Sequence, residues 1–193
     1  MSKKYLLILS LLLVSTFAMG ACFNSSQKPG EIKNFTLQDY NGKNLSLSDY
    51  KDSVAIVILF IATECPVSNA YNQRMENIFN EYGPKGFAFL GINSNKAEFV
   101  DRIKEHAEDN SLTFPILKDE NNVIADMFEA SVTPETYVLN SEFEILYHGR
   151  IDNSRNESEV VSKDLESALD EIYSGSDVSK KETKAFGCSI KRV

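Results

Sequence analysis

The chain has 193 residues, with 28 acidic and 20 basic side chains, a formal net charge of −8 and a hydrophobic content of 42%. This apolar content excludes a disordered chain, the length suits one domain of ordinary size, and the acidic balance argues against a nucleic-acid-binding surface. Three cysteines are too few for a disulfide-built miniprotein, and no close cysteine pair is present for a zinc ribbon.

The N-terminal residues have the pattern of an export signal. Lys3 and a second lysine precede an apolar run over 5–19, and two small residues then stand directly before Cys22. The run is too short to cross a membrane comfortably as a helix. We therefore predict a signal peptide over 1–21, followed by a flexible tether over 22–30.

This segment resembles a bacterial lipoprotein signal, in which the cysteine after the small residues is lipidated. The resemblance implies that Cys22 carries a lipid anchor and that the protein is exported, facing the periplasm or the cell exterior. The alternative is an ordinary secretory peptide cut near Gly20 or Ala21, which leaves Cys22 as a free terminal thiol. Either cleavage places the protein where disulfides are permitted.

The body of the chain predicts alternating strands and helices. Apolar runs and Asn-Gly turn chemistry predict strands over 35–37, 45–47, 54–61, 87–92, 136–139 and 144–148. Apolar residues at helical spacing predict helices over 71–82, 95–107, 123–128 and 161–172. The order predicts an α/β domain over 31–175, in which a central mixed sheet lies between helices and begins with a hairpin. A polar tail over 176–193 follows.

Three local interpretations concern single side chains. Asn95 and Glu98 have the spacing of a capping box at the start of the 95–107 helix, whose inward residues include Phe99. Glu76 is expected on a solvated helix face. Arg150 is a candidate for positive charge near a thiolate, but a surface pair with its neighbour at position 152 is the preferred interpretation.

Cys65 is the candidate nucleophile. It lies between the buried 54–61 strand and the next helix, where free backbone N–H groups and the helix dipole stabilise a thiolate. Pro66 suits the first helical turn because it has no N–H to leave unpaired. The thiolate is the attacking form in disulfide exchange, so a lowered pKa at this position raises reactivity.

These residues resemble the thioredoxin superfamily. Cys65-Pro66-Val67-Ser68 matches the C-x-x-C motif with Ser68 in place of the second cysteine, and the Leu45-Ser46-Leu47-Ser48-Asp49-Tyr50 segment is similar to the redoxin branch of AhpC/TSA type. That branch groups thiol-specific antioxidants with membrane-tethered thiol oxidoreductases. The resemblance implies a thioredoxin-like fold, and supporting roles at the thiolate for Ser68 and Thr63.

A second matching segment is Val132-Thr133-Pro134-Glu135-Thr136. It is similar to the superfamily loop whose cis-proline packs against the active-site cysteine. The resemblance makes Pro134 that proline and Thr133 the residue that presents its backbone to a disulfide substrate. It implies no organic cofactor and no metal, with electrons supplied by another thiol protein.

The match to true peroxiredoxins is incomplete. Their proline and threonine, seven and three positions before the peroxidatic cysteine, are replaced by Ile58 and Ala62, and Thr63 is one position out of register. Thiol–disulfide exchange is therefore favoured over a peroxiredoxin-like peroxide reductase. A non-catalytic binding or copper-handling module is the alternative of another class, although copper handling needs a second cysteine where Ser68 stands.

Cys188 is the candidate resolving thiol for Cys65. Phe186 and Ile190 are apolar residues in a polar stretch, which indicates that this part of the tail docks, and Gly187 permits close backbone approach. An extended tail reaches on the order of 40 Å, enough for any face of a small domain. A static exported disulfide, or a free thiol that never meets Cys65, are the other interpretations, because sequence does not define disulfide pairing.

Overall fold

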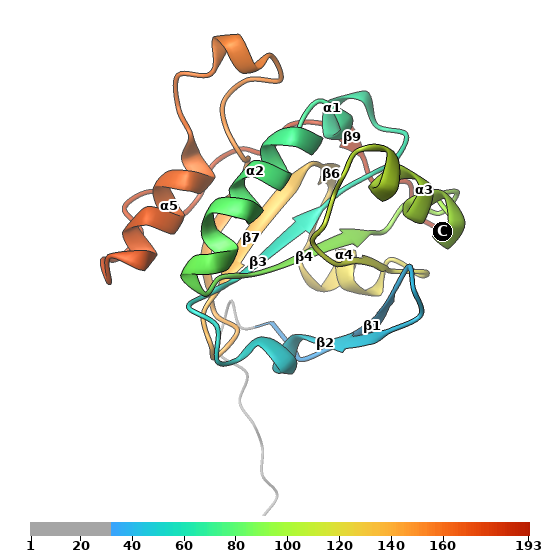
Figure 1. Cartoon of the computed structure of the whole chain (residues 1–193), viewed down its shortest axis with the longest axis horizontal. Helices are drawn as coiled ribbons and strands as arrows, with labels where there is room; N and C mark the ends of the chain where they lie inside the picture. Colours follow the sequence, from blue (N-terminus) through green and yellow to red (C-terminus); the bar gives the residue numbers. More distant parts are fainter. Residues whose placement is uncertain (1–31) are drawn as a thin grey trace, which may run out of the picture.

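The computed structural model describes residues 32–193, so the predicted signal peptide, Cys22 and the tether lie outside the described residues. The main sheet has seven strands in the order β2-β1-β5-β4-β3-β7-β8 (Figure 1). Its strands are β1 (Thr36–Asp39), β2 (Asn44–Ser46), β3 (Ile56–Phe60), β4 (Ala88–Asn93), β5 (Ile116–Lys118), β7 (Glu135–Leu139) and β8 (Ile145–Gly149). The helices are α1 (Pro66–Asn69), α2 (Asn72–Tyr82), α3 (Val100–Asp109), α4 (Val123–Met127) and α5 (Asp164–Tyr173).

The sheet is mixed, as the element order predicted. β3 pairs in parallel with β4 and antiparallel with β7, and every residue of β3 is buried. A continuous run of β-branched and aliphatic residues suits this central position because both faces of the strand are covered. The N-terminal hairpin of β1 and β2 extends the sheet at the edge where β1 pairs with β5.

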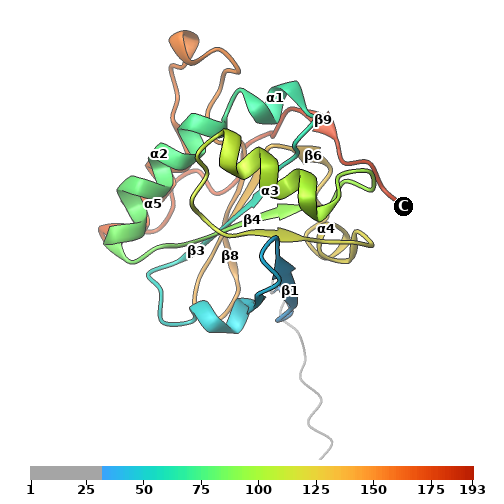
Figure 2. The same cartoon turned by 45° about the vertical axis from the view of Figure 1, so that its right-hand side comes forward.

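Alternate residues of β3 contribute to two separate apolar clusters, one on each face of the sheet. Val57 and Leu59 pack with α2, α3 and α5. Ile56, Ile58 and Phe60 pack with α4 and the hairpin. Figures 1 and 2 show α2 and α3 on the same side of the strands. The two-residue period of a strand therefore builds both layers from one sequence segment.

The two local interpretations that concern helix residues are wrong. Helix α3 begins at Val100, and Phe99 is its N-cap residue with 68% of its surface exposed, so Phe99 does not face the core. No capping box forms there, because the carboxylate of Glu98 binds another loop. Glu76 is buried on α2 and accepts hydrogen bonds from the backbone N–H and hydroxyl of Thr113, at 2.8 and 2.5 Å.

A second, two-stranded sheet lies beside α1 (Figure 2). It consists of β6 (Val132–Thr133) and β9 (Cys188–Ser189), which run antiparallel. The polar tail therefore docks on the domain over much of its length. Within residues 32–193, no helix is long and apolar enough to span a bilayer.

Candidate active site

Cys65 stands where the chain leaves β3 and begins α1. It is the N-cap residue of α1, and Pro66 occupies the first turn, as predicted. Helix α1 is short, and the chain passes through Tyr71 before α2 begins at Asn72. The Cys65 side chain is 4% exposed, so the sulfur is covered by neighbouring segments.

The Cys65 sulfur both accepts and donates hydrogen bonds. The backbone N–H of Ser68 donates to it at 3.3 Å, and the thiol form donates to the carbonyl oxygen of Thr133 at 3.4 Å. Burial opposes ionisation, but hydrogen bonds from the Cys188 thiol and from the backbone N–H of Ser68 outweigh it and lower the pKa of Cys65. The thiolate is therefore the favoured reduced form of this side chain at a lower pH than for an ordinary cysteine.

Cys188 lies next to Cys65 although the two are far apart in sequence. β9 places Cys188 directly opposite Thr133 in the register of the small sheet. Its thiol hydrogen-bonds the Cys65 sulfur, and this bond, together with burial, raises the pKa of Cys188. Both cysteines are in the free thiol form, Cys65 buried and Cys188 partly exposed. The structure thus brings together the two cysteines of the resolving hypothesis.

The other predicted site residues take different places around the sulfur. The Ser68 hydroxyl accepts the Ala62 N–H at 3.1 Å, so the Ser68 side chain shapes the loop while its backbone binds the sulfur. Thr63 acts through its backbone, whose carbonyl accepts the Asn69 amide at 2.9 Å. Pro134 is buried and follows a cis peptide bond, as the resemblance implied.

Glu98 is a site residue that the sequence did not reveal. It is 4% exposed, and its carboxylate accepts the N–H groups of Thr63 and Glu64, at 2.6 and 3.3 Å. The amide of Asn93, at the end of β4, donates to the same carboxylate at 2.6 Å. The available signal was topological: parallel strands β3 and β4 end at the same sheet edge, so the loops that follow them meet there.

The expected pair between Arg150 and Asp152 does not form. Arg150 donates from Nε to Asp164 at 2.8 Å, and Asp152 instead receives Arg74 from α2 at 2.5 Å. The chain bends over 151–153, which turns the two side chains towards different elements. The Arg150 guanidinium therefore pairs with Asp164, and the leading contacts that set the pKa of Cys65 come from Cys188 and Ser68.

The profile of the AhpC/TSA family matches residues 30–153, well over half of the chain. The chain belongs to the AhpC/TSA family. This assignment confirms the redoxin resemblance that the active-site and proline-loop motifs carried.

Curated relatives of this AhpC/TSA chain include thiol-disulfide oxidoreductases and peroxiredoxins. The thiol-disulfide oxidoreductase ResA of Halalkalibacterium halodurans is 26% identical over 152 residues, which are 75% of this chain and 85% of that relative. A chloroplastic peroxiredoxin Q of Gentiana triflora is 27% identical over 143 residues, 69% of this chain and 64% of that relative. These relatives support an oxidoreductase of the redoxin type, with thiol proteins as its redox partners.

Two solved structures match most of this AhpC/TSA chain. A hypothetical protein of Sinorhizobium meliloti 1021 has a TM-score of 0.80 at 30% identity and covers 85% of this chain and 94% of its own. An uncharacterised conserved protein of Geobacillus kaustophilus has a TM-score of 0.78 at 33% identity, with coverages of 83% and 89%. A thioredoxin domain of a thiol-disulfide oxidoreductase from Bacteroides vulgatus shares the fold at a TM-score of 0.54 and 18% identity. The predicted thioredoxin-like fold is confirmed.

Proposed function

We propose that this AhpC/TSA protein is a thiol–disulfide oxidoreductase in which Cys65 is the nucleophile and Cys188 the resolving thiol. The observation that carries the proposal is the position of Cys188, which the register of β6 and β9 places opposite Thr133, whose carbonyl oxygen lies 3.4 Å from the Cys65 sulfur. A lowered pKa on one sulfur and a raised pKa on its neighbour favour a single thiolate on Cys65. This arrangement supports Cys65 as the attacking sulfur and Cys188 as the thiol that reacts with the mixed disulfide on Cys65.

The proposed cycle begins with the Cys65 thiolate. It attacks one sulfur of an oxidised substrate, the substrate S–S bond breaks, and one substrate thiolate leaves. Cys188 then loses its proton to solvent or to the leaving thiolate and attacks Cys65. The second substrate thiol departs, and the protein holds a Cys65–Cys188 disulfide. A reduced thiol protein supplies the two electrons that restore both thiols.

Mass spectrometry after mild oxidation tests this pairing. Peptides from non-reduced protein are expected to contain a linkage between Cys65 and Cys188. Cys188→Ser is expected to stop at a mixed disulfide on Cys65, and Cys65→Ser to lose disulfide reduction altogether. If the only linkages recovered are intermolecular Cys65–Cys65 disulfides, the proposal is contradicted.

Peroxide reduction is the second candidate, supported by the peroxiredoxin Q relatives. In that reaction the Cys65 thiolate attacks a peroxide oxygen, the O–O bond breaks, and a sulfenic acid and water form after proton uptake. Cys188 then displaces a second water to give the same disulfide. Ile58 and Ala62, in place of the peroxiredoxin proline and threonine, favour disulfide exchange. Stopped-flow peroxide consumption faster than disulfide reduction would reverse this preference.

A non-catalytic module is the third candidate. In this case Cys65 captures a partner or a copper ion without turnover. Among the described residues, no group of three His, Cys, Asp or Glu side chains is placed to hold a metal. Absence of both disulfide reduction and peroxide consumption in a folded sample would favour this candidate over the other two.

We further propose export and a lipid anchor on Cys22, which support contact with thiol proteins outside the cytoplasm. The proposal rests on the lysine-led apolar run before Cys22. The full-length protein is expected to partition into the detergent phase, and Cys22→Ala into the aqueous phase. Partition of the unsubstituted protein into the aqueous phase would contradict the anchor but not the thiol chemistry.

A further inference from the structure

Strand β6 offers a short backbone edge at the active site. It lies outside the main sheet, and in the described part of the chain its strand partner is β9. An unpaired strand edge is a template for an extended peptide, which binds through main-chain hydrogen bonds. In this structure the protein's own tail fills that edge (Figure 1).

The register of β6 and β9 determines which residue of a bound strand lies at the Cys65 sulfur. The carbonyl oxygen of Thr133 lies 3.4 Å from the Cys65 sulfur, so the residue paired with Thr133 also lies at that sulfur. Cys188 holds this position. An extended substrate paired in the same way would have its own reactive cysteine there. The tail therefore occupies the place that a bound disulfide peptide needs.

The residue before Cys188 shows how closely the tail is fitted. A Cβ atom added to Gly187 would lie 2.0 Å from the Thr133 carbonyl oxygen and 2.6 Å from its carbonyl carbon. Such distances are far below any van der Waals contact, and the neighbour is backbone that has no freedom to move away. Only glycine permits this approach of the tail to β6. We call residues 184–190 the strap.

The strap is held at its N-terminal side by strand β8. The His148 N–H donates to the Lys181 carbonyl, and the Thr183 N–H donates to the His148 carbonyl, both at 2.9 Å. The Thr183 hydroxyl is buried between the Tyr147 hydroxyl, at 2.8 Å, and the Arg150 N–H, at 3.0 Å. Phe186 then contacts the Tyr71 ring edge-on.

The C-terminal side of the strap is held by other elements. Ile190 is 7% exposed within the apolar cluster under α4, and its N–H donates to the Ser131 carbonyl at 3.0 Å. The Lys191 N–H donates to the Asn95 side chain at 2.8 Å. The Val193 N–H donates to the Asn122 side chain at 2.8 Å. With both sides attached, the docked strap covers Cys65 as a fixed part of the fold.

We propose that the docked strap occupies the position on β6 that an extended peptide substrate would take. While it is docked, only small-molecule oxidants react with Cys65. Compact disulfides or peroxides reach the sulfur beneath the strap, whereas a disulfide within a polypeptide needs the β6 edge that the strap occupies. Protein disulfides therefore react only after the strap leaves β6. This inference rests on the proposed nucleophilic role of Cys65.

The test uses a reaction with Cys65 alone, so that resolution by Cys188 does not enter. In a Cys188→Ser background, the Cys65 thiolate attacks a disulfide, one thiolate leaves, and a mixed disulfide remains on Cys65. Hydroxyethyl disulfide is the small probe, and native insulin with its disulfides intact is the protein probe. Acid-quenched mass spectrometry gives the rate of adduct formation for each probe.

Two alanine substitutions on either side of position 188 form a matched pair. Gly187→Ala removes the docked register because its Cβ meets the Thr133 carbonyl. Ser189→Ala is the control, because the Ser189 side chain is exposed and its backbone is unchanged. Circular dichroism and thermal unfolding verify that both variants retain the fold.

Gly187→Ala is expected to raise the insulin rate about tenfold or more, which corresponds to about 1.4 kcal/mol of lost docking free energy. The hydroxyethyl disulfide rate is expected to stay within about twofold in both variants, as is the insulin rate of Ser189→Ala. An insulin rate unaffected by Gly187→Ala, or an equal rise with both probes, would overturn the inference and leave the proposed function intact. No adduct with either probe in any folded variant would instead refute Cys65 as the nucleophile.

Discussion

The sulfur of Cys65 owes its lowered pKa to one neighbour in its own helical turn and to one in the distant tail. The Cys188 thiol makes the leading hydrogen bond to it, followed by the backbone N–H of Ser68. The same contact raises the pKa of Cys188, so between the two pKa values Cys65 carries the charge and Cys188 keeps its proton. In the reduced protein, the negative charge of this pair therefore resides on Cys65 and is not divided between the two sulfurs.

Removing the neighbouring thiol should therefore raise the pKa of Cys65. In Cys188→Ala, the thiolate form loses its leading hydrogen bond, so the pH midpoint of Cys65 alkylation by iodoacetamide is expected to move upward. Below that midpoint the protonated fraction grows and the alkylation rate falls. Ser189→Ala is the control and should keep the midpoint of the unsubstituted protein. An unchanged midpoint in Cys188→Ala would show that the contact does not tune Cys65.

At the residue scale, the sequence predicted what is decided locally. Cys65 and Pro66 follow from a buried strand that leads into a helix, and that boundary is visible in the apolar pattern. The partners of Glu98 and Arg150 were not predicted, because each binds a residue more than ten positions away, on another element. Spacing along the chain carries no information on such contacts.

At the element scale, the loop before α3 supports the loop that carries the nucleophile. The carboxylate of Glu98 bridges the N–H groups of Thr63 and Glu64 to the amide of Asn93. All three partner groups are N–H donors. The two oxygens of a carboxylate accept all three hydrogen bonds, whereas an amide has only one oxygen to accept them. The position of Cys65 relative to β4 depends on this bridge.

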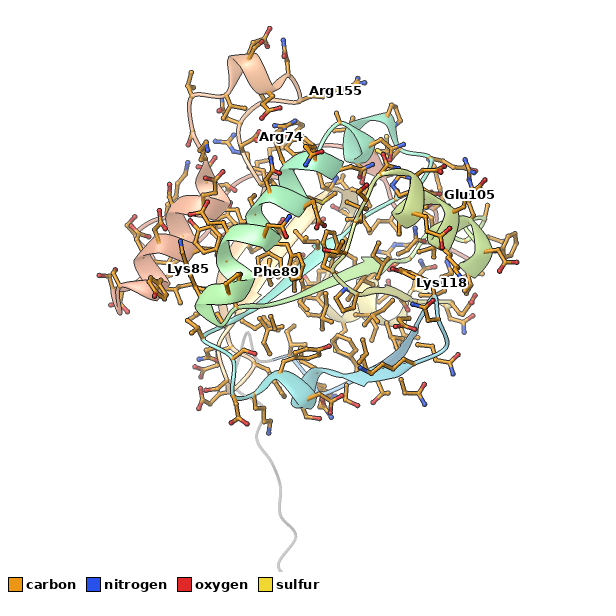
Figure 3. The ribbon with its side chains drawn as sticks, viewed as in Figure 1. Arg74, Lys85, Phe89, Glu105, Lys118 and Arg155 are labelled. Carbon is orange, nitrogen blue, oxygen red and sulfur yellow. The ribbon has the colours of Figure 1, made fainter. Side chains whose placement is uncertain are left out.

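Glu98→Gln is expected to lower the free energy of unfolding by about 1–3 kcal/mol, because an amide nitrogen then faces a buried donor. Glu105→Gln on α3 is the matched control. Glu105 points outward in Figure 3 and pairs with Arg102 at the surface, so removing its charge should leave the free energy of unfolding nearly unchanged. Urea denaturation of the two variants measures the difference. Equal stabilities would contradict a structural role for the Glu98 bridge.

The long elements, the N-terminal hairpin and helix α4 were predicted from sequence, whereas three short strands were not. Strands β3, β4, β7 and β8 and helix α2 follow from apolar runs or from a helical period. Strands β6 and β9 are two residues each, too short for any period, and they exist because the tail meets the proline loop. β5 is three residues long and was also missed. Of these short strands, β6 and β9 bring Thr133 and Cys188 to the candidate site.

At the scale of the whole molecule, a buried ion pair connects α2 with the long loop between β8 and α5. Arg74 donates to Asp152 and to the carbonyl groups of Ser154 and Arg155. The Tyr71 hydroxyl donates to Asp152 at 2.9 Å, and the Arg74 guanidinium stacks on the Tyr71 ring at 3.7 Å. In Figure 3, Arg74 lies on α2 below the protruding loop that carries Arg155.

Asp152→Asn is expected to destabilise the protein by about 3 kcal/mol or more, because it leaves the Arg74 charge buried without a counter-ion. Glu81→Gln is the control, since Glu81 on the same helix forms an exposed pair with Lys85 and should cost about 0.5 kcal/mol or less. Thermal unfolding gives both values. A small effect of Asp152→Asn would mean that water reaches Arg74 in solution.

The docked tail also relates the redox state of the protein to its folding. The proposed disulfide would close a loop of about 120 residues, whereas a C-x-x-C pair closes a ring of only a few. By chain entropy, a bridge over such a loop stabilises the folded state by roughly 4–5 kcal/mol. Thermodynamic linkage then makes dithiol oxidation more favourable in the folded chain than in the unfolded chain by the same amount, or by about 100 mV. Reduction by a partner would thus return the enzyme to its less stable form in every cycle.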